Sequence, residues 1–184
     1  MKAFRHFIFI PCVFFFSRLT FCAPIPRTPL QNFVGDGVFN GGGTAQMVNL
    51  HRIRWSPHKG YERWVFDFSD EPNHAIGKIA PEFQVRYVKA EKVPVPGGED
   101  ILIDPPKFVF LFRGIHQNHL KKARLQRMVR KSRYVKEIVL YPPIEGGDTA
   151  VEFLLKDSVV FEPHQPLERE GRLVLDLKNA PLGQ

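Results

Sequence analysis

From Met47 onward, short runs of apolar or alternating residues are separated by Pro and Gly, a pattern typical of strands joined by turns. In residues 83–89, Phe83, Val85 and Tyr87 alternate with polar residues, which predicts a strand with one buried face. Short strands in this number suggest a sandwich or a barrel. Of these we expect an all-β fold of the first kind, a β-sandwich of two small sheets with a short basic insert. The expected strands cover residues 48–55, 63–68, 83–89, 101–103, 108–112, 135–141, 150–155 and 172–177.

Two of these strands share a pattern of Arg, Val and Asp. Residues 63–68 read R-W-V-F-D-F and residues 172–177 read R-L-V-L-D-L. Because side chains alternate across a strand, the Arg, Val and Asp of each lie on one face and the large apolar residues on the other, toward the core. Ion pairs that fix the strand register are one interpretation of the polar face. A binding site is the other, and its candidate residues are Arg63, Asp67, Arg172 and Asp176.

A strand, a Pro/Gly turn and a second strand also recur along the chain. The spacing of Ile, Pro, Gly and Val between Ile53 and Asp67 returns between Ile138 and Phe153. The recurrence fits a duplicated hairpin, which would make the sandwich pseudo-symmetric, and it fits chance equally, because these residues are frequent in β proteins.

The first 22 residues are organised like a secretory signal peptide. Lys2, Arg5 and His6 precede an apolar run of ten residues, 7–16, and short, mostly small or apolar residues follow. Ten apolar residues are too few to cross a hydrocarbon core that needs roughly 20, and no later stretch is longer. We therefore expect an exported protein, periplasmic or associated with the cell envelope, with no membrane span in the mature chain.

The position of cleavage decides the fate of the two cysteines. Cleavage after Cys22 leaves no cysteine, and hence no disulfide. The alternative is a lipoprotein signal in which Cys22 is acylated, although Phe21 is bulky where such signals carry a small residue. Removing residues 1–22 takes away three of 26 basic residues and none of the 19 acidic ones, which leaves 23 against 19 and a net charge of +4. Outside the cytoplasm, this excess favours anionic envelope polymers over nucleic acid.

Residues 23–46 are rich in Pro and Gly without sustained periodicity, which predicts a flexible spacer before a domain over residues 47–184. Within that domain, L-H-R-I-R-W-S-P-H-K-G-Y-E-R-W-V-F-D-F, F-Q-V-R-Y-V and R-L-V-L-D-L-K-N-A resemble the AMIN (amidase N-terminal) domain, especially its AMIN-like branch, in which a G-x-x-R-x-V-x-[DE] strand follows a V-x-x-I-R start. The resemblance implies an exported β-sandwich that binds the cell wall and positions envelope machinery. In that family the domain precedes amidases or secretin channels. Since nothing follows Gln184 here, we expect the targeting module alone.

The strongest local charge signal lies in residues 119–134, where basic residues gather without an acid. Leu120, Ala123, the stem of Arg127 and Met128 line one face of a short basic helix if the segment is helical, and a basic arm between strands is the alternative. As a function it predicts an anchor for wall phosphates, acidic glycans or lipid head groups, and a solvated connection is the other interpretation. The anchor residues are Lys121, Lys122, Arg124, Arg127, Arg130, Lys131 and Arg133.

Motifs for catalysis are missing from the sequence. His116 and His119 are the only close histidine pair, no serine sits in G-x-S-x-G, and the glycine runs lack the setting of a phosphate loop. We therefore expect no metal, no cofactor and no enzymatic activity. A hydrolase that works through two carboxylates stays an alternative, because two acids suffice for glycoside hydrolysis. Its candidates are Glu62, Asp67, Glu152 and Asp176.

Taken together, these features predict an exported, non-catalytic module that binds peptidoglycan or another anionic envelope glycan. An Arg guanidinium beside a carboxylate suits the carboxylates, amides and hydroxyls of peptidoglycan. The first alternative is a protein-interaction module of a secretion or division complex, and the second is the carboxylate hydrolase. No nucleic-acid partner is expected.

Overall fold

A computed structural model describes residues 22–25, 32–44, 48–70, 79–93, 101–143, 147–166 and 171–180. The expected signal peptide, apart from Cys22, lies outside these residues. The described elements are β1 (Cys22–Pro24), β2 (Val38–Gly41), β3 (Val48–His58), β4 (Tyr61–Asp70), β5 (Phe83–Val88), β6 (Glu91–Val93), β7 (Ile101–Asp104), β8 (Lys107–Phe112), β9 (Ile115–Asn118), α1 (Lys122–Lys131), β10 (Val135–Leu140), β11 (Thr149–Leu155), β12 (Val159–His164) and β13 (Arg172–Asn179).

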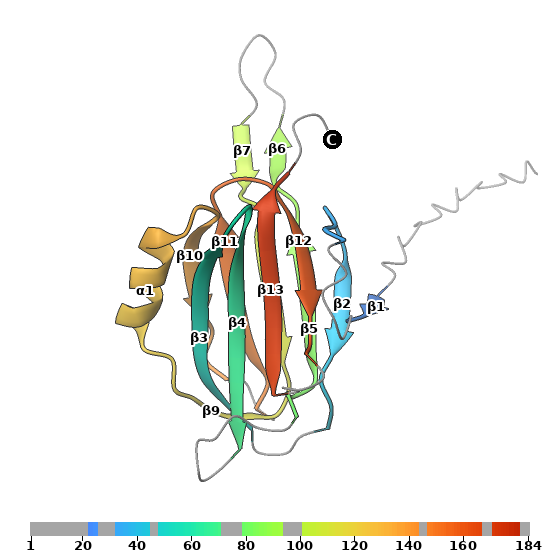
Figure 1. Cartoon of the computed structure of the whole chain (residues 1–184), viewed down its shortest axis with the longest axis vertical. Coiled ribbons are helices and arrows are strands. Elements are labelled where there is room, and N and C mark those ends of the chain that lie inside the picture. The colour runs from blue at the N-terminus through green and yellow to red at the C-terminus, as the bar shows by residue number, and fades with distance from the viewer. Residues whose placement is uncertain are drawn as a thin grey trace, which may run out of the picture.

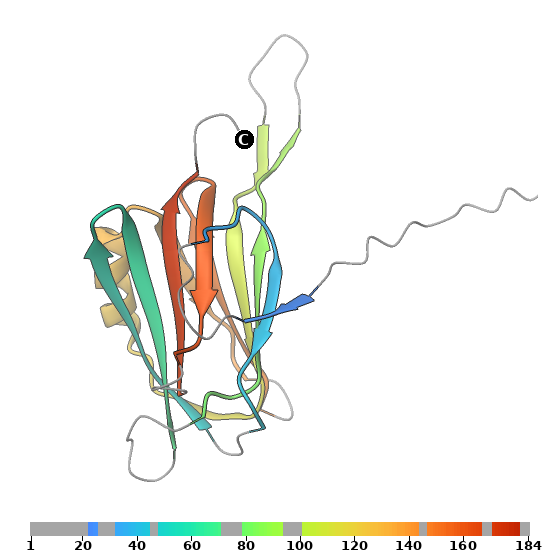
Figure 2. The same cartoon turned by 45° about the vertical axis from the view of Figure 1, so that its right-hand side comes forward.

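The strands form two facing sheets, which confirms the all-β sandwich (Figures 1 and 2). One sheet has the order β1-β2-β5-β8-β11-β10 and the other the order β12-β13-β4-β3-β9. Most neighbours are antiparallel, while β1 with β2 and β3 with β9 are parallel. The short strands β6 and β7 pair with each other and project from one end of the sandwich.

Aromatic side chains from both sheets fill the space between them. The ring centroids of Phe66 on β4 and Phe110 on β8 lie 4.6 Å apart, and those of Trp64 and Phe153 lie 5.0 Å apart. All four side chains are fully buried. Burial of each large apolar side chain contributes roughly 1.5–3 kcal/mol, and aromatic pairs add about 0.5–1.5 kcal/mol. The core therefore follows directly from the apolar positions of the alternating strands.

All eight strands expected from alternation are present, as β3, β4, β5, β7, β8, β10, β11 and β13. In β5, Phe83, Val85 and Tyr87 are buried as predicted. Both recurrent segments are hairpins, β3 with β4 in one sheet and β10 with β11 in the other. The strand β12 lacks alternation because all six of its residues are buried, and so the pattern did not predict it.

Residues 32–44 belong to the sandwich, which corrects the expected spacer over this part of the chain. The strand β2 pairs with β5, and Val34 exchanges two backbone hydrogen bonds with Phe161 of β12, at 2.9 and 2.8 Å. Gly42 has φ +79°, and a Cβ there would lie 1.8 Å from the carbonyl oxygen of Pro81. Glycine is thus required by a close backbone approach, whereas its frequency in the sequence indicated flexibility.

The basic segment forms a helix, α1, which covers the open side of the sandwich between β3 and β10 (Figure 1). Leu125 and Met128 are its buried residues. Ala123, which we expected on the apolar face, is exposed, and Leu125 takes that place because residues three positions apart share a helix face. No helix in the described part of the chain is long and apolar enough to cross a bilayer.

Candidate functional site

The two Arg-Val-Asp strands, β4 and β13, are antiparallel neighbours. Arg63 lies opposite Asp176 and Asp67 opposite Arg172. The Nε and Nη2 atoms of Arg63 each donate a hydrogen bond of 2.7 Å to Asp176, and the Nε of Arg172 donates one of 2.8 Å to Asp67. The structure therefore brings the four predicted residues together as two cross-strand ion pairs.

Asp67 binds two further arginines from β3. The Nε atoms of Arg52 and Arg54 donate to its Oδ2 at 2.7 and 2.6 Å, and the Nη2 of Arg54 donates to its Oδ1 at 2.8 Å. Burial is the largest influence on the pKa of Asp67 and raises it, but the hydrogen bonds and charges of the arginines outweigh burial and hold the pKa below its ordinary value. Three guanidinium groups therefore surround one buried carboxylate.

The second ion pair lies beside a buried histidine. The hydrogen bond to Asp176 raises the pKa of Arg63, against the opposing effect of burial. His164 on β12 is buried next to this pair, and burial lowers the pKa of its imidazole. The charges of Asp176 and Glu162 favour the protonated ring and that of Arg63 opposes it, so desolvation decides the direction.

Arg52 and Arg54 on β3 lie beside further cationic residues of α1. A cavity of about 530 Å³ lies between the two elements. Arg124, Arg127 and Lys131 line it from one side of the helix, since they are spaced by three and four residues. Arg54 lines it from β3. The apolar part of its wall is formed by Trp55, Val65 and Met128.

A neighbouring cavity of about 400 Å³ extends the first along β3 and shares Arg124 with it. Its lining includes Arg52 and Lys121 together with His51 and His119, whose ring centroids are 6.4 Å apart. None of the described residues that line the two cavities is acidic. We call the two cavities together the basic groove, with the cationic residues Arg52, Arg54, Lys121, Arg124, Arg127 and Lys131.

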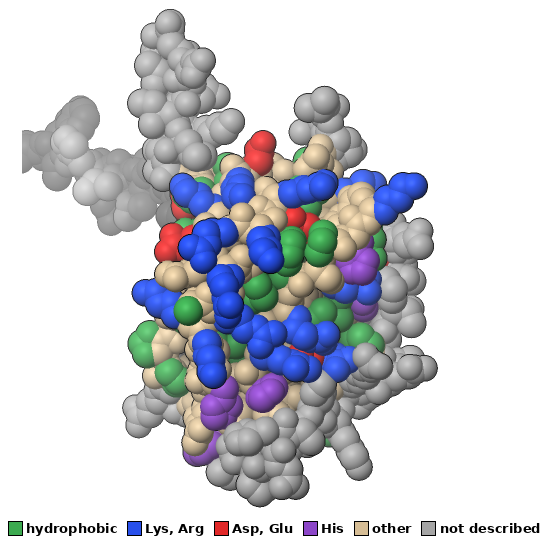
Figure 3. All heavy atoms as spheres, turned by 60° about the vertical axis from the view of Figure 1, so that its left-hand side comes forward, with side chains coloured by type: hydrophobic (Ala, Val, Ile, Leu, Met, Phe, Trp, Pro, Cys, Tyr) green, Lys and Arg blue, Asp and Glu red, His purple; other side chains and the backbone are tan. Residues whose placement is uncertain are grey.

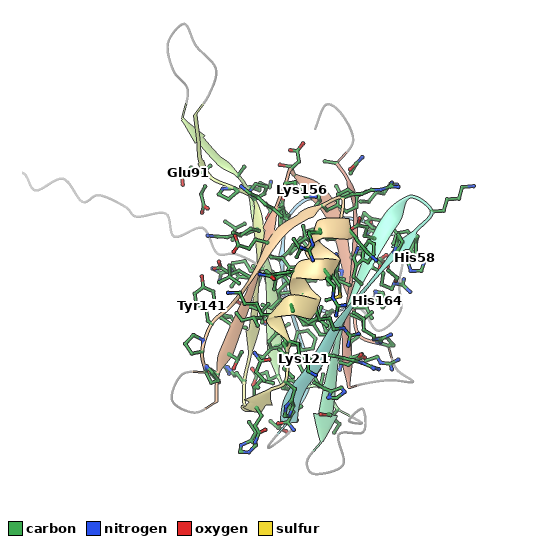
Figure 4. All side chains as sticks on the ribbon, turned by 90° about the vertical axis from the view of Figure 1, so that its left-hand side faces the viewer. His58, Glu91, Lys121, Tyr141, Lys156 and His164 are labelled. Carbon is green, nitrogen blue, oxygen red and sulfur yellow. The ribbon has the colours of Figure 1, made fainter. Side chains whose placement is uncertain are left out.

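Lys and Arg side chains gather on this side of the molecule, with hydrophobic side chains between them (Figure 3). Seen with α1 toward the viewer, the helix lies between β3 and β10, and Lys121 lies directly before its first residue (Figure 4). The groove thus has one wall on a rigid sheet and one on a helix packed against the core.

Glu62 fixes the end of α1 against the sheet. Its carboxylate accepts hydrogen bonds from the Oγ of Ser132 at 2.7 Å, the backbone N–H of Arg133 at 2.5 Å and the Nε1 of Trp55 at 3.0 Å. Ser132 follows α1 directly and is buried. These bonds join β3, β4 and the end of the helix at one point.

The structure divides the predicted anchor residues between two sides of α1. Lys121, Arg124, Arg127 and Lys131 line the basic groove, whereas Lys122 and Arg130 line a cavity toward β10. Arg133 is exposed beyond the helix. Arg52 and Arg54 were not among the candidates, although their spacing by two residues in a predicted strand signals a shared face.

The acids considered for hydrolysis are engaged by groups of this chain. Glu62 binds the helix end, Asp67 and Asp176 bind arginines, and Glu152 accepts a hydrogen bond of 3.0 Å from the hydroxyl of Tyr141. Among the described residues, no group of three or more His, Cys, Asp or Glu side chains is placed to hold a metal ion.

No family model matches the chain, and no match was found among curated proteins. The AMIN-like resemblance stays a prediction from the sequence motifs. The candidate site therefore rests on the geometry and charge of the basic groove.

Proposed function

We propose that this chain is a non-catalytic binding module of the cell envelope that holds an anionic glycan polymer in the basic groove. Peptidoglycan is the polymer that we propose above the others. One observation carries the proposal: six cationic side chains, from β3, α1 and the residue before α1, line a groove with no acid among its described lining residues. The expected signal peptide directs the protein to the compartment where such polymers occur.

The chemistry of the groove suits a polymer that carries carboxylates or phosphates. A guanidinium presents a planar fork that matches both groups, and Arg124 and Arg127 carry such forks into the groove. Asp67 holds Arg52 and Arg54 in place through their Nε atoms. Trp55 adds an aromatic surface, and such a ring can pack against the apolar face of a sugar. Asp67, which is itself fully buried, then serves to position Arg52 and Arg54.

Co-sedimentation of the purified protein, without the predicted leader, with peptidoglycan sacculi at low and high salt tests the proposal. We expect binding at low salt and its loss at high salt, because salt screens exposed charges. A double variant, Arg124→Glu with Arg127→Glu, should stay in the supernatant. Both side chains are exposed, so the fold should persist.

The matched control is Lys122→Glu with Arg130→Glu, which makes the same change of net charge on the other side of α1. We expect this control to sediment like the unmodified protein. Equal loss in both double variants would indicate a response to net charge alone and would contradict the basic groove. Release of soluble muropeptides by the unmodified protein would contradict the non-catalytic assignment.

A further inference from the structure

The side of α1 that faces β10 carries a second groove of a different kind. Its volume is about 650 Å³, and we call it the strand-edge groove. The lining residues are Lys122, Leu125, Gln126, Val129 and Arg130 from α1 and Lys136, Glu137, Ile138, Val139 and Leu140 from β10. Five of these ten residues are apolar and three are basic.

One wall of the strand-edge groove is the last strand of a sheet. In the described part of the chain, β10 pairs with β11 alone. The backbone N–H of Tyr141 donates to the carbonyl of Ala150 at 3.1 Å. Since bonded and non-bonded positions alternate in an antiparallel pair, Val139 also bonds toward β11, and the backbone N–H and C=O groups of Ile138 and Leu140 point away from it.

We propose that β10 accepts an extended, acidic segment of a partner protein as an added strand in the strand-edge groove. An open strand edge pairs readily with another chain, and the main-chain hydrogen bonds supply affinity in such complexes. Ile138 and Leu140 offer the backbone groups, while Leu125 and Val129 of α1 offer apolar contacts to alternate side chains of the added strand.

Charge selects the kind of segment. Lys122, Arg130 and Lys136 line the strand-edge groove against a single acid, Glu137. Glutamates or aspartates on the added strand would meet these cations, and complementary charge sets register and excludes other partners. A second copy of this chain fits less well, because two identical edges would bring the same cations face to face.

The test uses a labelled, capped peptide of about six residues, the usual strand length, in which glutamate alternates with valine. Binding to the purified protein is followed by fluorescence anisotropy, and hydrogen exchange of single amides is measured by NMR. We expect saturable binding with slower exchange at Ile138 and Leu140. Methylation of the peptide's pairing amides should abolish binding, because it removes the hydrogen-bond donors.

Two variants distinguish binding of the peptide in the strand-edge groove from binding in the basic groove. Arg130→Glu should weaken peptide binding about tenfold, because it places a like charge against the acidic strand. Arg127→Glu, at a residue that lines the basic groove and not the strand-edge groove, should leave peptide affinity unchanged. Absence of binding, equal binding of a peptide with lysine in place of glutamate, or binding without slower exchange at Ile138 and Leu140 would overturn the added strand.

Discussion

At the scale of single residues, Asp67 is the carboxylate that binds three of the arginines on the outer face of its sheet. Three arginines, from the two strands that flank β4, donate to its carboxylate, which is completely buried. A buried carboxylate is stable only with such partners. Asp67 therefore serves both the stability of the sandwich and the placement of Arg52 and Arg54 in the basic groove.

The Asp67→Asn variant should lower the free energy of unfolding by about 2–3 kcal/mol. Removing one partner of a buried ion pair leaves the other charge uncompensated, although the partly exposed side chains of Arg52 and Arg54, 36% each, soften the loss. Urea denaturation measures the change. The control is Glu82→Gln, whose partner Arg113 lies at 3.0 Å on the surface and whose loss should cost less than about 1 kcal/mol. Equal losses in the two variants would contradict the central role of Asp67.

His164 should make stability depend on pH below its ordinary pKa of 6.5. Burial lowers the pKa of the folded state, so the unfolded chain binds more protons in this range. The contribution is present above pH 6.5 and is lost as the pH falls toward the lowered value. Melting temperatures at about pH 7 and about pH 5 should differ less in His164→Gln than in the unmodified protein.

His58→Gln is the control for this pH dependence, because the His58 ring is exposed and stacks on Tyr61 with 4.7 Å between ring centroids. It should keep the difference in melting temperature of the unmodified protein. If His164→Gln also keeps that difference, other groups are responsible for it.

At the scale of elements, alternation predicted strands such as β5, β8 and β11, in which buried residues alternate with less buried ones. It gave no signal for β12, whose two faces are both covered, or for β2, which lies in a segment rich in glycine. Glycine is required there by a close approach of backbone segments that are far apart in the sequence, such as Gly42 and Pro81. Local composition carries no information about such an approach.

The Gly42→Ala variant should therefore be strongly destabilised, by about 2 kcal/mol or more, because φ is positive and the added Cβ would collide with the carbonyl of Pro81. Gly60→Ala is the matched control. Gly60 also has positive φ, +90°, but nothing lies within 4 Å of an added Cβ, so only the backbone cost of roughly 1 kcal/mol applies. Thermal melts of both variants compare the two, and equal destabilisation would mean that the contact with Pro81 relaxes.

At the scale of the whole molecule, the N-terminal segment ties the two sheets together. It adds β1 and β2 to one sheet and bonds through Val34 to β12 of the other. The rings of Phe39 and Phe161 also meet edge to face, with 5.8 Å between centroids. A chain that begins at residue 45 should melt about 10 °C or more below one that begins at Ala23, because several kcal/mol of contacts are lost. An unchanged melting temperature would restore the spacer interpretation.

The candidate site was only partly predictable from the sequence. Alternation could place the Arg and Asp of each strand on the face away from the core, namely Arg63 with Asp67 and Arg172 with Asp176. Which Arg pairs with which Asp depends on the register of β4 and β13. The basic groove arises because α1 packs beside β3, more than 60 positions earlier in the chain. Such a juxtaposition is set by tertiary packing, and no periodicity within either segment reports it.

The pairing of β4 with β13 also disfavours shifted strand registers during folding. The two strands carry the same order of charges and run in opposite directions, so only one alignment joins both pairs. A slip by two residues in one direction would set Arg63 opposite Lys178, and a slip by four would set it opposite Arg172 or set Asp67 opposite Asp176. Each of these shifted registers thus leaves a charged side chain opposite a like charge or an apolar residue. The free energy is lowest only in the native register.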